Sequence, residues 1–302
     1  MSPDILIIGG GPASLTAGLY ALRAGRSVTV LEKEAIGGQI ADSPRVENFP
    51  SIASISGLDL ANNMFENYSN LGGNFEMDEA KSIEKTEDGF ITHGIYGDYE
   101  SKSVIIATGV KHRHLNIEGE DKYLGHGISY CAVCDGAFYE GKDVTVIGDA
   151  NSALQYALML EKICSHVNVV TLFDKFFADE VLVKALLSSN KVTIYHNKNS
   201  LRFLGDEKSL TSVIFEDTKT KEIMELKTSG VFVAIGQMPD NERFADLVDL
   251  DHGFIVVNED KATKTPGIFA AGDCTSKKVR QLTTACGDGA IAALSANRYL
   301  YK

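Results

Sequence analysis

The chain contains the same strand–turn–helix–strand pattern twice, and this repeat limits its possible folds more than any other feature. In the first copy, an apolar run at residues 4–8 leads into the turn "GGGPAS", a stretch with helical apolar spacing at 12–22, and a second apolar run at 27–32. In the second copy, "KDVTVIG" at residues 142–148 leads into a helical stretch at 151–163 and returns as "HVNVVTLF". Strands connected by helices in this way pair in parallel, so we expect an α/β fold.

The first turn has the residues that an adenine dinucleotide needs. Gly9 permits a tight turn, and Gly11 lets the backbone approach a pyrophosphate that lies on the helix N-terminus. Pro12 stands where a helix begins without losing a hydrogen bond, and the third position of the motif is the small residue Ser14. Glu32 ends the second strand 21 residues beyond Gly11, where a carboxylate accepts hydrogen bonds from a ribose. We therefore expect adenine dinucleotide binding at this turn.

The second turn keeps its first glycine but loses the other features. It reads Gly148-Asp149-Ala150, and the methyl group of Ala150 blocks the close approach of a pyrophosphate to the backbone. Asp149 adds a negative charge beside the place where phosphates would lie. The segment after the next strand, "TLFDKFFAD", has no arginine for a ribose 2′-phosphate. We expect this unit to keep its fold without a nicotinamide site.

Two of the five cysteines, Cys131 and Cys134, stand in a C-x-x-C motif. A structural zinc site usually needs four ligands, and no second C-x-x-C or H-x-x-x-H run supplies the other two. The spacing therefore favours a redox pair. Cys164, Cys274 and Cys286 are interpreted as small buried hydrophobic residues.

Length and charge narrow the class of protein. With 302 residues the chain is long enough for two domains, and its formal net charge of −12 argues against a nucleic acid partner. No apolar stretch approaches the roughly 20 residues that cross a bilayer, and the N-terminus has the pattern of a strand instead of a signal peptide. We expect no membrane association and a cytoplasmic location. A positive run with Lys277, Lys278 and Arg280 is a candidate contact for an acidic partner.

A series of motifs in one order resembles the low-molecular-weight thioredoxin reductase family from end to end: "GGGPAS", "GGQI", "VENFP", "ATG", "CAVCDG", "FVAIGQMP", "GIFAAGDC" and "RQLTTACGDGAIAA". The resemblance implies two Rossmann-like, three-layer ββα/αβ domains. A discontinuous FAD-binding domain would comprise residues 1–112 and 245–302. The inserted redox-disulfide domain, residues 113–244, would resemble an NADPH domain with a degraded nucleotide site. The resemblance also implies a homodimer.

The resemblance assigns roles to individual residues. Cys134 would be the sulfur nearest the flavin, Cys131 would attack the disulfide of thioredoxin, and Asp135 would be the general acid. Asp273 would bind the ribityl chain, although the Gly-Asp dipeptide by itself is equally compatible with a plain turn. The full set of residues implied for FAD binding is Gly9, Gly11, Pro12, Ala13, Glu32, Gln39, Asn48, Thr108, Gly109, Gly272, Asp273, Arg280 and Gln281.

The departures from the family pattern concentrate in the second unit. The basic positions of NADPH-dependent members fall here on Thr171, Leu172, Phe173 and Phe177. This pattern is similar to the ferredoxin-dependent flavin thioredoxin reductases, which implies reduced ferredoxin as the electron donor, one FAD per chain and no NADPH site. The alternatives are an NAD(P)H-dependent thioredoxin reductase with an atypical site, a diflavin-linked disulfide oxidoreductase, and a non-enzymatic FAD-binding redox sensor.

Overall fold

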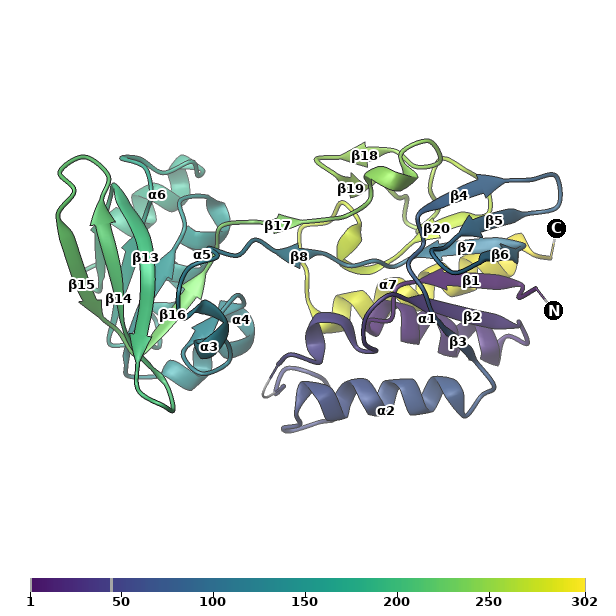
Figure 1. The fold of residues 1–302 in the computed structure, drawn as a ribbon, viewed down its shortest axis with the longest axis horizontal. Helices are drawn as coiled ribbons and strands as arrows, with labels where there is room; N and C mark the ends of the chain where they lie inside the picture. The colour runs from purple at the N-terminus through teal and green to yellow at the C-terminus, as the bar shows by residue number, and fades with distance from the viewer. Residues whose placement is uncertain (1, 44–45, 302) are drawn as a thin grey trace. The chain divides into compact units, whose positions relative to one another are not determined.

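A computed structural model describes residues 2–43 and 46–301, and it divides into two compact units (Figure 1). The first unit comprises Met1–Lys111 and Met238–Lys302, and the second comprises His112–Gln237. The chain passes from one unit to the other through β8 (Lys111–His112) and β17 (Gln237–Met238), which pair as a two-stranded sheet. No helix among the described residues has both the length and the apolar character needed to cross a membrane.

The first unit is built on a five-stranded parallel sheet in the order β20-β7-β1-β2-β3. Its strands are β1 (Ile5–Ile8), β2 (Val28–Glu32), β3 (Asn74–Met77), β7 (Ser103–Ile106) and β20 (Ile268–Ala270). β1 and β7 are buried along their whole length, as expected for parallel strands covered on both faces.

Helices cover one face of this sheet, and a small antiparallel sheet covers the other (Figure 1). The helices are α1 (Pro12–Arg23), α2 (Gly57–Ser69) and α7 (Leu282–Tyr299), and the antiparallel strands are β4 (Ser82–Lys85), β5 (Phe90–His93) and β6 (Asp98–Ser101). Alternate residues of β1 belong to the two cores: Ile5 and Ile7 pack with the helices, whereas Leu6 and Ile8 pack toward the antiparallel sheet. The unit therefore has three layers.

Residues 238–244 belong to the first unit, although we expected them at the end of the inserted domain. This segment contains η3 (Glu242–Phe244) and is followed by β18 (Leu250–Asp251) and β19 (Phe254–Ile255). The amide of Asn241 is buried and donates to the carbonyl oxygens of Gly253 and Cys274, at 2.9 and 3.0 Å. Phe244 is 1% exposed in the core of the unit. These long-range contacts, which no local pattern signals, move the boundary from 244/245 to 237/238.

The second unit repeats the layered plan around the parallel sheet β12-β11-β10-β16-β9. Its strands are β9 (Ile128–Ser129), β10 (Asp143–Ile147), β11 (His166–Val170), β12 (Val192–Tyr195) and β16 (Gly230–Val233). Helices α5 (Asn151–Leu160) and α6 (Glu180–Leu187) cover one face, and the antiparallel strands β13 (Lys198–Gly205), β14 (Leu210–Asp217) and β15 (Ile223–Lys227) cover the other (Figure 1). The expected α/β fold with two Rossmann-like units is confirmed.

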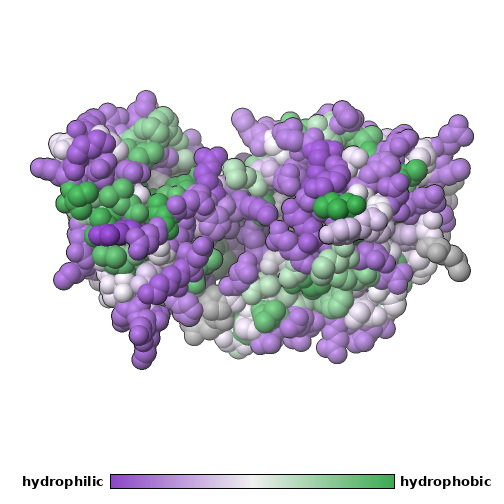
Figure 2. Space-filling model, viewed as in Figure 1, coloured by the Kyte–Doolittle hydropathy of each residue, from purple (hydrophilic) through white to green (hydrophobic). Residues whose placement is uncertain are grey.

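The visible face in Figure 2 is mostly hydrophilic on both units, with smaller hydrophobic patches between the polar side chains. Half-exposed aromatic residues of the second unit include Phe173 and Phe177, whose rings meet edge to face with centroids 5.4 Å apart. Both belong to the segment in which NADPH-dependent relatives were expected to carry basic residues. Their apolar character therefore bears on the site described next.

Candidate functional site

The turn between β1 and α1 leaves the N-terminus of a 12-residue helix open. Gly9 has φ +112°, and a Cβ atom there would lie 2.3 Å from the carbonyl oxygen of Ala107, so only glycine fits. Gly11 is the N-cap of α1, but no side chain caps the helix. A Cβ at Gly11 would meet only the Gly37 oxygen, at 3.9 Å, so that side of the turn is open space. The unpaired N–H groups of α1 are therefore free to bind an anion.

Glu32 is fixed beside this turn. Its carboxylate accepts the N–H of Gly10 at 2.5 Å and that of Glu34 at 2.8 Å. Glu32 also lines a pocket together with Gly9, Thr108 and Gly109, which were all expected in the dinucleotide site. The pocket is open to solvent, and a water-sized molecule can occupy about 60 Å³ of it, which is below the range of about 300–1,000 Å³ typical of small-molecule sites.

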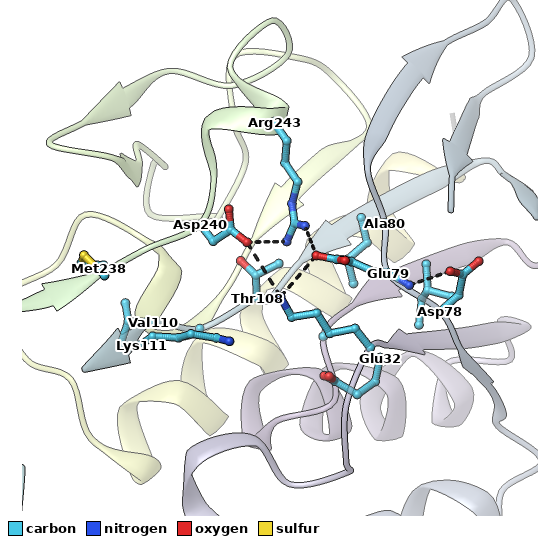
Figure 3. Close-up of a pocket in the computed structure, with 15 residues that line it drawn as sticks. Glu32, Asp78, Glu79, Ala80, Thr108, Val110, Lys111, Met238, Asp240 and Arg243 are labelled. Carbon is cyan, nitrogen blue, oxygen red and sulfur yellow. Dashed lines mark hydrogen bonds and ion pairs between the residues drawn. The ribbon is translucent and has the colours of Figure 1, made fainter. Parts of the chain in front are cut away.

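Four charged residues from three separate segments form an ion network in the wall of this pocket (Figure 3). The Glu79 carboxylate lies 3.0 Å from Arg243 Nη1 and 3.3 Å from Lys33 Nζ, and Asp240 lies 3.4 Å from Arg243 Nη2. The hydrogen bond from Lys81, followed by those from Lys33 and Arg243, lowers the pKa of Glu79 to about 2. Sequence reasoning missed this network because its members lie up to 210 positions apart.

A second group of expected residues gathers at η4 (Gly272–Cys274) and the start of α7. Gly272 has φ +79°, and a Cβ there would meet the Ala13 side chain at 2.8 Å, so this group touches the start of α1. Burial raises the pKa of the Asp273 carboxyl despite its ion pair with Lys277 at 3.3 Å. The Arg280 guanidinium donates to the carbonyl oxygens of Asp273 and Thr275.

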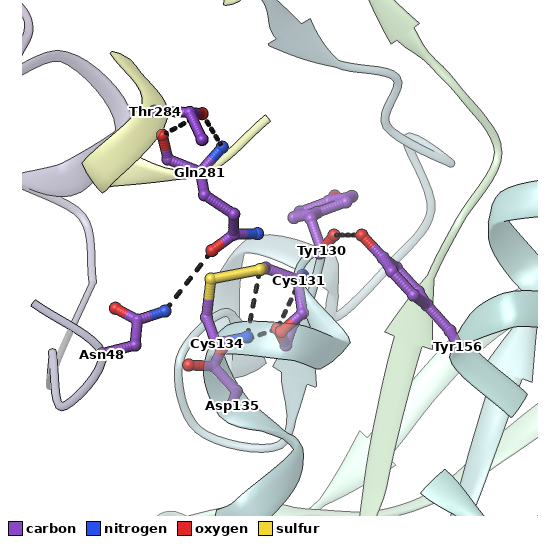
Figure 4. The surroundings of a disulfide bond; sticks show 9 residues. Asn48, Tyr130, Cys131, Cys134, Asp135, Tyr156, Gln281 and Thr284 are labelled. Atoms are coloured by element: carbon purple, nitrogen blue, oxygen red, sulfur yellow. Dashed lines mark hydrogen bonds between the residues drawn. A yellow bond between two sulfur atoms is a disulfide. The ribbon is translucent and has the colours of Figure 1, made fainter. Parts of the chain in front are cut away.

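Three amide side chains extend this group. The Gln281 side chain and Thr284 form a reciprocal capping box at the start of α7. Asn48 Nδ2 donates to Gln281 Oε1 at 3.4 Å (Figure 4). Gln39 donates to the carbonyl oxygen of Val110, a residue of the pocket wall. Gln39, Asn48 and Gln281 are thus held in place within the first unit.

Lys277 does not provide the surface charge that the sequence suggested for an acidic partner. Its side chain is 14% exposed and lies between the carboxylates of Asp273 and Asp288, 2.9 Å from the latter. Lys278 is exposed, and Arg280 is partly buried with its guanidinium over the ring of Phe254. The expected positive patch is therefore reduced mainly to Lys278.

The residues of the first unit fit an adenine dinucleotide that carries a flavin. The open N-terminus of α1 suits the pyrophosphate, and the fixed carboxylate of Glu32 suits ribose hydroxyls. Burial disfavours the charge of the Asp273 carboxylate, and hydrogen bonds from the hydroxyl groups of a ribityl chain would offset that cost. The arrangement can therefore hold FAD.

Cys131 and Cys134 form a disulfide in the second unit, with Cα atoms 5.3 Å apart (Figure 4). Cys131 is the N-cap of the short helix α4 (Ala132–Asp135), and the N–H of Cys134 lies 3.2 Å from Cys131 Sγ. Asp135 ends α4, and one of its carboxylate oxygens accepts a hydrogen bond from Ser129 Oγ at 2.6 Å. The pair and the expected acid are therefore brought together.

Tyr130 connects the disulfide segment to groups that sequence reasoning left without a role. Its hydroxyl donates to the buried carboxylate of Glu120 at 2.6 Å and lies 2.9 Å from His114 Nδ1. The His112 ring stacks on Tyr130 with centroids 5.0 Å apart. Burial lowers the pKa of His112 to about 4, so this ring is neutral at pH 7. Tyr156 also donates to the Tyr130 carbonyl oxygen, at 3.5 Å (Figure 4).

The turn between β10 and α5 copies the backbone of the first turn with different side chains. Gly148 has φ +152°, and a Cβ there would lie 2.4 Å from the carbonyl oxygen of Ala234. Ala150 is the N-cap of α5. Burial raises the pKa of Asp149. The backbone N–H of Phe177 donates to the Asp149 carbonyl oxygen at 2.7 Å, so the aromatic segment crosses directly over the turn.

Comparison with known proteins identifies relatives along almost the whole chain. The family model "Pyridine nucleotide-disulphide oxidoreductase" matches residues 3–289. The chain is 42% identical, over 98% of its length and 97% of the relative, to the "34.2 kDa protein in rubredoxin operon" of Clostridium pasteurianum. It is 37% identical to thioredoxin reductase of Bacillus subtilis, over 98% of this chain and 94% of the relative. The crystal structure of thioredoxin reductase from Streptococcus pyogenes aligns with a TM-score of 0.95 at 37% identity, covering 99% of this chain and 98% of that one.

Proposed function

Because the chain belongs to the pyridine nucleotide-disulphide oxidoreductase family and is a flavoprotein disulfide oxidoreductase of the thioredoxin reductase type, we propose that it reduces thioredoxin with electrons from ferredoxin. The family implies FAD as the cofactor. The proposal assigns one FAD to the first unit and the disulfide chemistry to Cys131 and Cys134 of the second.

The chain's own residues would hold the flavin at the two groups described above. The N–H groups at the start of α1 would bind the pyrophosphate, Glu32 a ribose, and Asp273 the ribityl hydroxyls. When bound, FAD accepts electrons one at a time and delivers a pair to a disulfide, so it can link a one-electron donor to disulfide reduction. Gln39, Asn48 and Gln281 are assigned to the flavin side.

The second turn is the observation that carries the choice of donor. Its methyl group at Ala150 and its carboxyl at Asp149 stand where a dinucleotide needs bare backbone and no negative charge. The position equivalent to Glu32, 23 residues beyond the first glycine, is Thr171. The Thr171 hydroxyl already bonds the Phe173 carbonyl oxygen and His196 Nδ1, each at 2.7 Å. A nicotinamide cofactor would therefore find neither its phosphate site nor its ribose carboxylate.

The proposed exchange begins at Cys131. The N–H of Cys134 and the start of α4 both favour a thiolate at Cys131 Sγ. Attack by this thiolate on a substrate disulfide forms one S–S bond and breaks another. The expelled sulfur leaves with the electron pair and takes the proton of the Asp135 carboxyl. Asp135 then accepts the proton of the Cys134 thiol, whose sulfur attacks Cys131, reforms the enzyme disulfide and releases the substrate as a thiolate.

An anaerobic titration tests the donor. The purified protein is assayed for flavin per chain, and its flavin absorbance is then followed with NADPH, NADH and reduced ferredoxin in separate cuvettes. We expect one flavin per chain and bleaching by ferredoxin alone. Rapid bleaching by NADPH or NADH would make this a nicotinamide enzyme with an atypical site. Two flavins per chain would identify a diflavin enzyme, and bleaching without multiple turnover of any thioredoxin would identify a redox sensor.

Two matched variants test the roles of the sulfurs. Cys131→Ser should abolish thioredoxin reduction while leaving bound flavin and ferredoxin-driven bleaching intact. Cys134→Ser leaves the attacking thiolate in place, so it should trap thioredoxin as a stable mixed disulfide, visible on a non-reducing gel. If the Cys131→Ser protein forms that adduct instead, the two assignments must be exchanged.

Cellular location and assembly follow the same proposal. The expected cytoplasmic location agrees with the three free cysteines Cys164, Cys274 and Cys286, since reducing compartments preserve thiols. The homodimer implied by the family resemblance stays a prediction, and sedimentation of the flavin-loaded protein measures it.

A further inference from the structure

We propose that Ser129 is a positioning residue for the disulfide chemistry. Its hydroxyl holds the Asp135 carboxyl and the Cys131 backbone in one arrangement, and it donates to Asp135 when that carboxyl is ionised and accepts from it when it is protonated. This inference rests on the proposed role of Asp135 as general acid. It adds a residue that the motif "CAVCDG" does not contain.

Ser129 has a fixed place in the second unit. It ends β9, where it pairs with Phe232 of the fully buried strand β16, and it is 5% exposed. The polypeptide then turns into α4, which begins after Cys131, contains Cys134 and ends at Asp135. A group on this strand therefore provides a rigid reference point for a reactive segment of seven residues, 129–135.

The hydroxyl of Ser129 contacts Cys131 and Asp135, the first cysteine and the last residue of that segment. It donates to Asp135 Oδ2 at 2.6 Å and accepts the N–H of Cys131 at 3.0 Å. An O–H···O distance of about 2.5–2.7 Å is typical of a hydrogen bond to an ionised carboxylate. The bond therefore stabilises the form of Asp135 that has given up its proton.

A second acceptor lets the hydroxyl serve the protonated acid as well. The carbonyl oxygen of Cys131 lies 3.4 Å from Ser129 Oγ. When Asp135 carries a proton, the hydroxyl can rotate, donate to this carbonyl and accept from the carboxylic acid, because a serine hydroxyl has one donor and two acceptor sites. Ser129 thus remains bonded to Asp135 in both protonation states while the N–H of Cys131 stays paired. Removing the hydroxyl would leave the Asp135 carboxyl without this hydrogen bond each time it gains or loses a proton.

The test uses two small disulfides that differ in their need for an acid. The flavin-loaded protein is reduced with dithiothreitol, freed of excess reductant, and mixed with dithiobis(nitrobenzoate) or with hydroxyethyl disulfide. The aromatic disulfide releases an acidic thiol that leaves as a thiolate, whereas the alkyl disulfide releases a basic thiol that benefits from protonation. Neither reaction involves ferredoxin or thioredoxin, so the result does not depend on the donor or the protein substrate.

We expect Ser129→Ala to slow exchange with hydroxyethyl disulfide by about tenfold, a part of the roughly 10²- to 10⁴-fold effect of a general acid, with little change for the aromatic disulfide. Asp135→Asn should show the larger loss, and Ser129→Ala should add nothing in the double variant. Ser129→Thr keeps the hydroxyl and should recover most of the rate. The matched control is Ser212→Ala, because Ser212 is equally buried and donates to Glu225 at 2.7 Å in the antiparallel sheet, away from the cysteines.

The outcomes separate the two levels of the proposal. If Asp135→Asn slows the alkyl reaction but Ser129→Ala does not, the positioning role is wrong and the acid assignment stands. If Asp135→Asn has no effect, both fail. Equal slowing of both disulfides by Ser129→Ala, or additive losses in the double variant, would indicate general damage to the fold and overturn the proposal. If Ser129→Ala does not retain flavin, Ser129→Thr decides, because a folded threonine variant that keeps its hydroxyl yet loses the acid-dependent rate contradicts it.

Discussion

The turn at Gly9–Gly11 and the turn at Gly148–Ala150 share one backbone frame. In each, the first glycine has a positive φ and lies against the carbonyl oxygen of a residue that follows a neighbouring strand. Its N–H donates to the carbonyl oxygen of the residue just before Glu32 or its counterpart Thr171: from Gly9 to Leu31 at 2.8 Å, and from Gly148 to Val170 at 3.0 Å. In each, a backbone N–H from the following segment then bonds the middle residue of the turn, from Gly37 in one and Phe177 in the other.

The two turns differ at their second and third positions, and a Cβ at Gly10 of the first turn would lie 2.8 Å from the Glu32 side chain. Gly10 and Gly11 are replaced by Asp149 and Ala150, and Gly37 has an aromatic counterpart in the crossing segment of the second unit. The first position keeps its glycine in both turns, because a Cβ at Gly148 would collide with Ala234 whether or not a cofactor binds. Fold requirements and ligand requirements thus fall on different residues of a single short motif, and they can be lost separately.

The largest effect is expected from giving the first turn the alanine of the second. In Gly11→Ala the new methyl group has room in the protein itself, so thermal stability without flavin should change little. The methyl group would meet the bound pyrophosphate, and overpacking of about 1–3 kcal/mol corresponds to roughly 5- to 150-fold weaker FAD binding. Flavin retained after dialysis, measured by absorbance, checks this.

The mirror-image variant Ala150→Gly is the matched control, and its flavin content should equal that of the parent protein. If Gly11→Ala keeps its flavin as well as Ala150→Gly does, the second position of the turn does not control binding, and the comparison loses its explanation.

A smaller effect is expected at the acidic position that the second unit lacks. Glu32→Thr introduces the residue found at 171, and it removes a carboxylate that accepts two backbone N–H groups. Each charge-assisted bond contributes about 1.5–3 kcal/mol, part of which water replaces at this partly exposed site. We expect FAD affinity to fall about tenfold, as measured by fluorescence of released flavin. Thr171→Glu, the reverse exchange, should leave flavin content unchanged.

A further prediction concerns the charge in the second turn. Burial raises the pKa of Asp149 above its ordinary value of 3.8, so ionising this carboxyl destabilises the folded unit. The penalty is absent at pH below the unfolded pKa, develops as pH rises through the folded pKa, and is complete at pH 7. Asp149→Asn should therefore raise the free energy of unfolding at pH 7, by at most about 0.5 kcal/mol because water screens this partly exposed carboxyl, and leave it unchanged at pH 3. Denaturant unfolding at both pH values measures the difference, and an equal gain at pH 3 would contradict it.

The smallest change is expected when only the turn is repaired. Asp149→Gly combined with Ala150→Gly restores bare backbone but leaves Phe177 bonded across the turn and Thr171 engaged with His196. We expect no NADPH-driven flavin bleaching above the parent level. Appreciable bleaching would mean that these two side chains alone closed the site.

The sequence predicted what depends on local order. The strand–turn–helix units, the tight turn at Gly9 and the position of Glu32 at the end of its strand are each set by residues within about 25 positions, and all appear where expected. The burial of Lys277 could not be predicted, because a lysine in a charged run is normally exposed. Its partner Asp288 comes from α7, 11 positions further along the chain. Asn241 is similar, since the carbonyl oxygens that bind it come from residues 253 and 274. Ser129 lies close to the motif, but its contact depends on the turn that α4 makes after β9.

The first unit is assembled from both sides of an insertion, which has a consequence for the order of events during synthesis. β20 pairs with β7, and α7 packs closely on α1, with Gly289 admitting the backbone of Ala13. The second unit is complete at residue 237, so it can fold on the ribosome while the first sheet still lacks an edge strand and a covering helix. Asp273 also arrives late. We expect the segment with Cys131 and Cys134 to be structured before a flavin site exists. The nascent protein would therefore pass through a stage in which it has both thiols but cannot yet bind the flavin that reduces their disulfide.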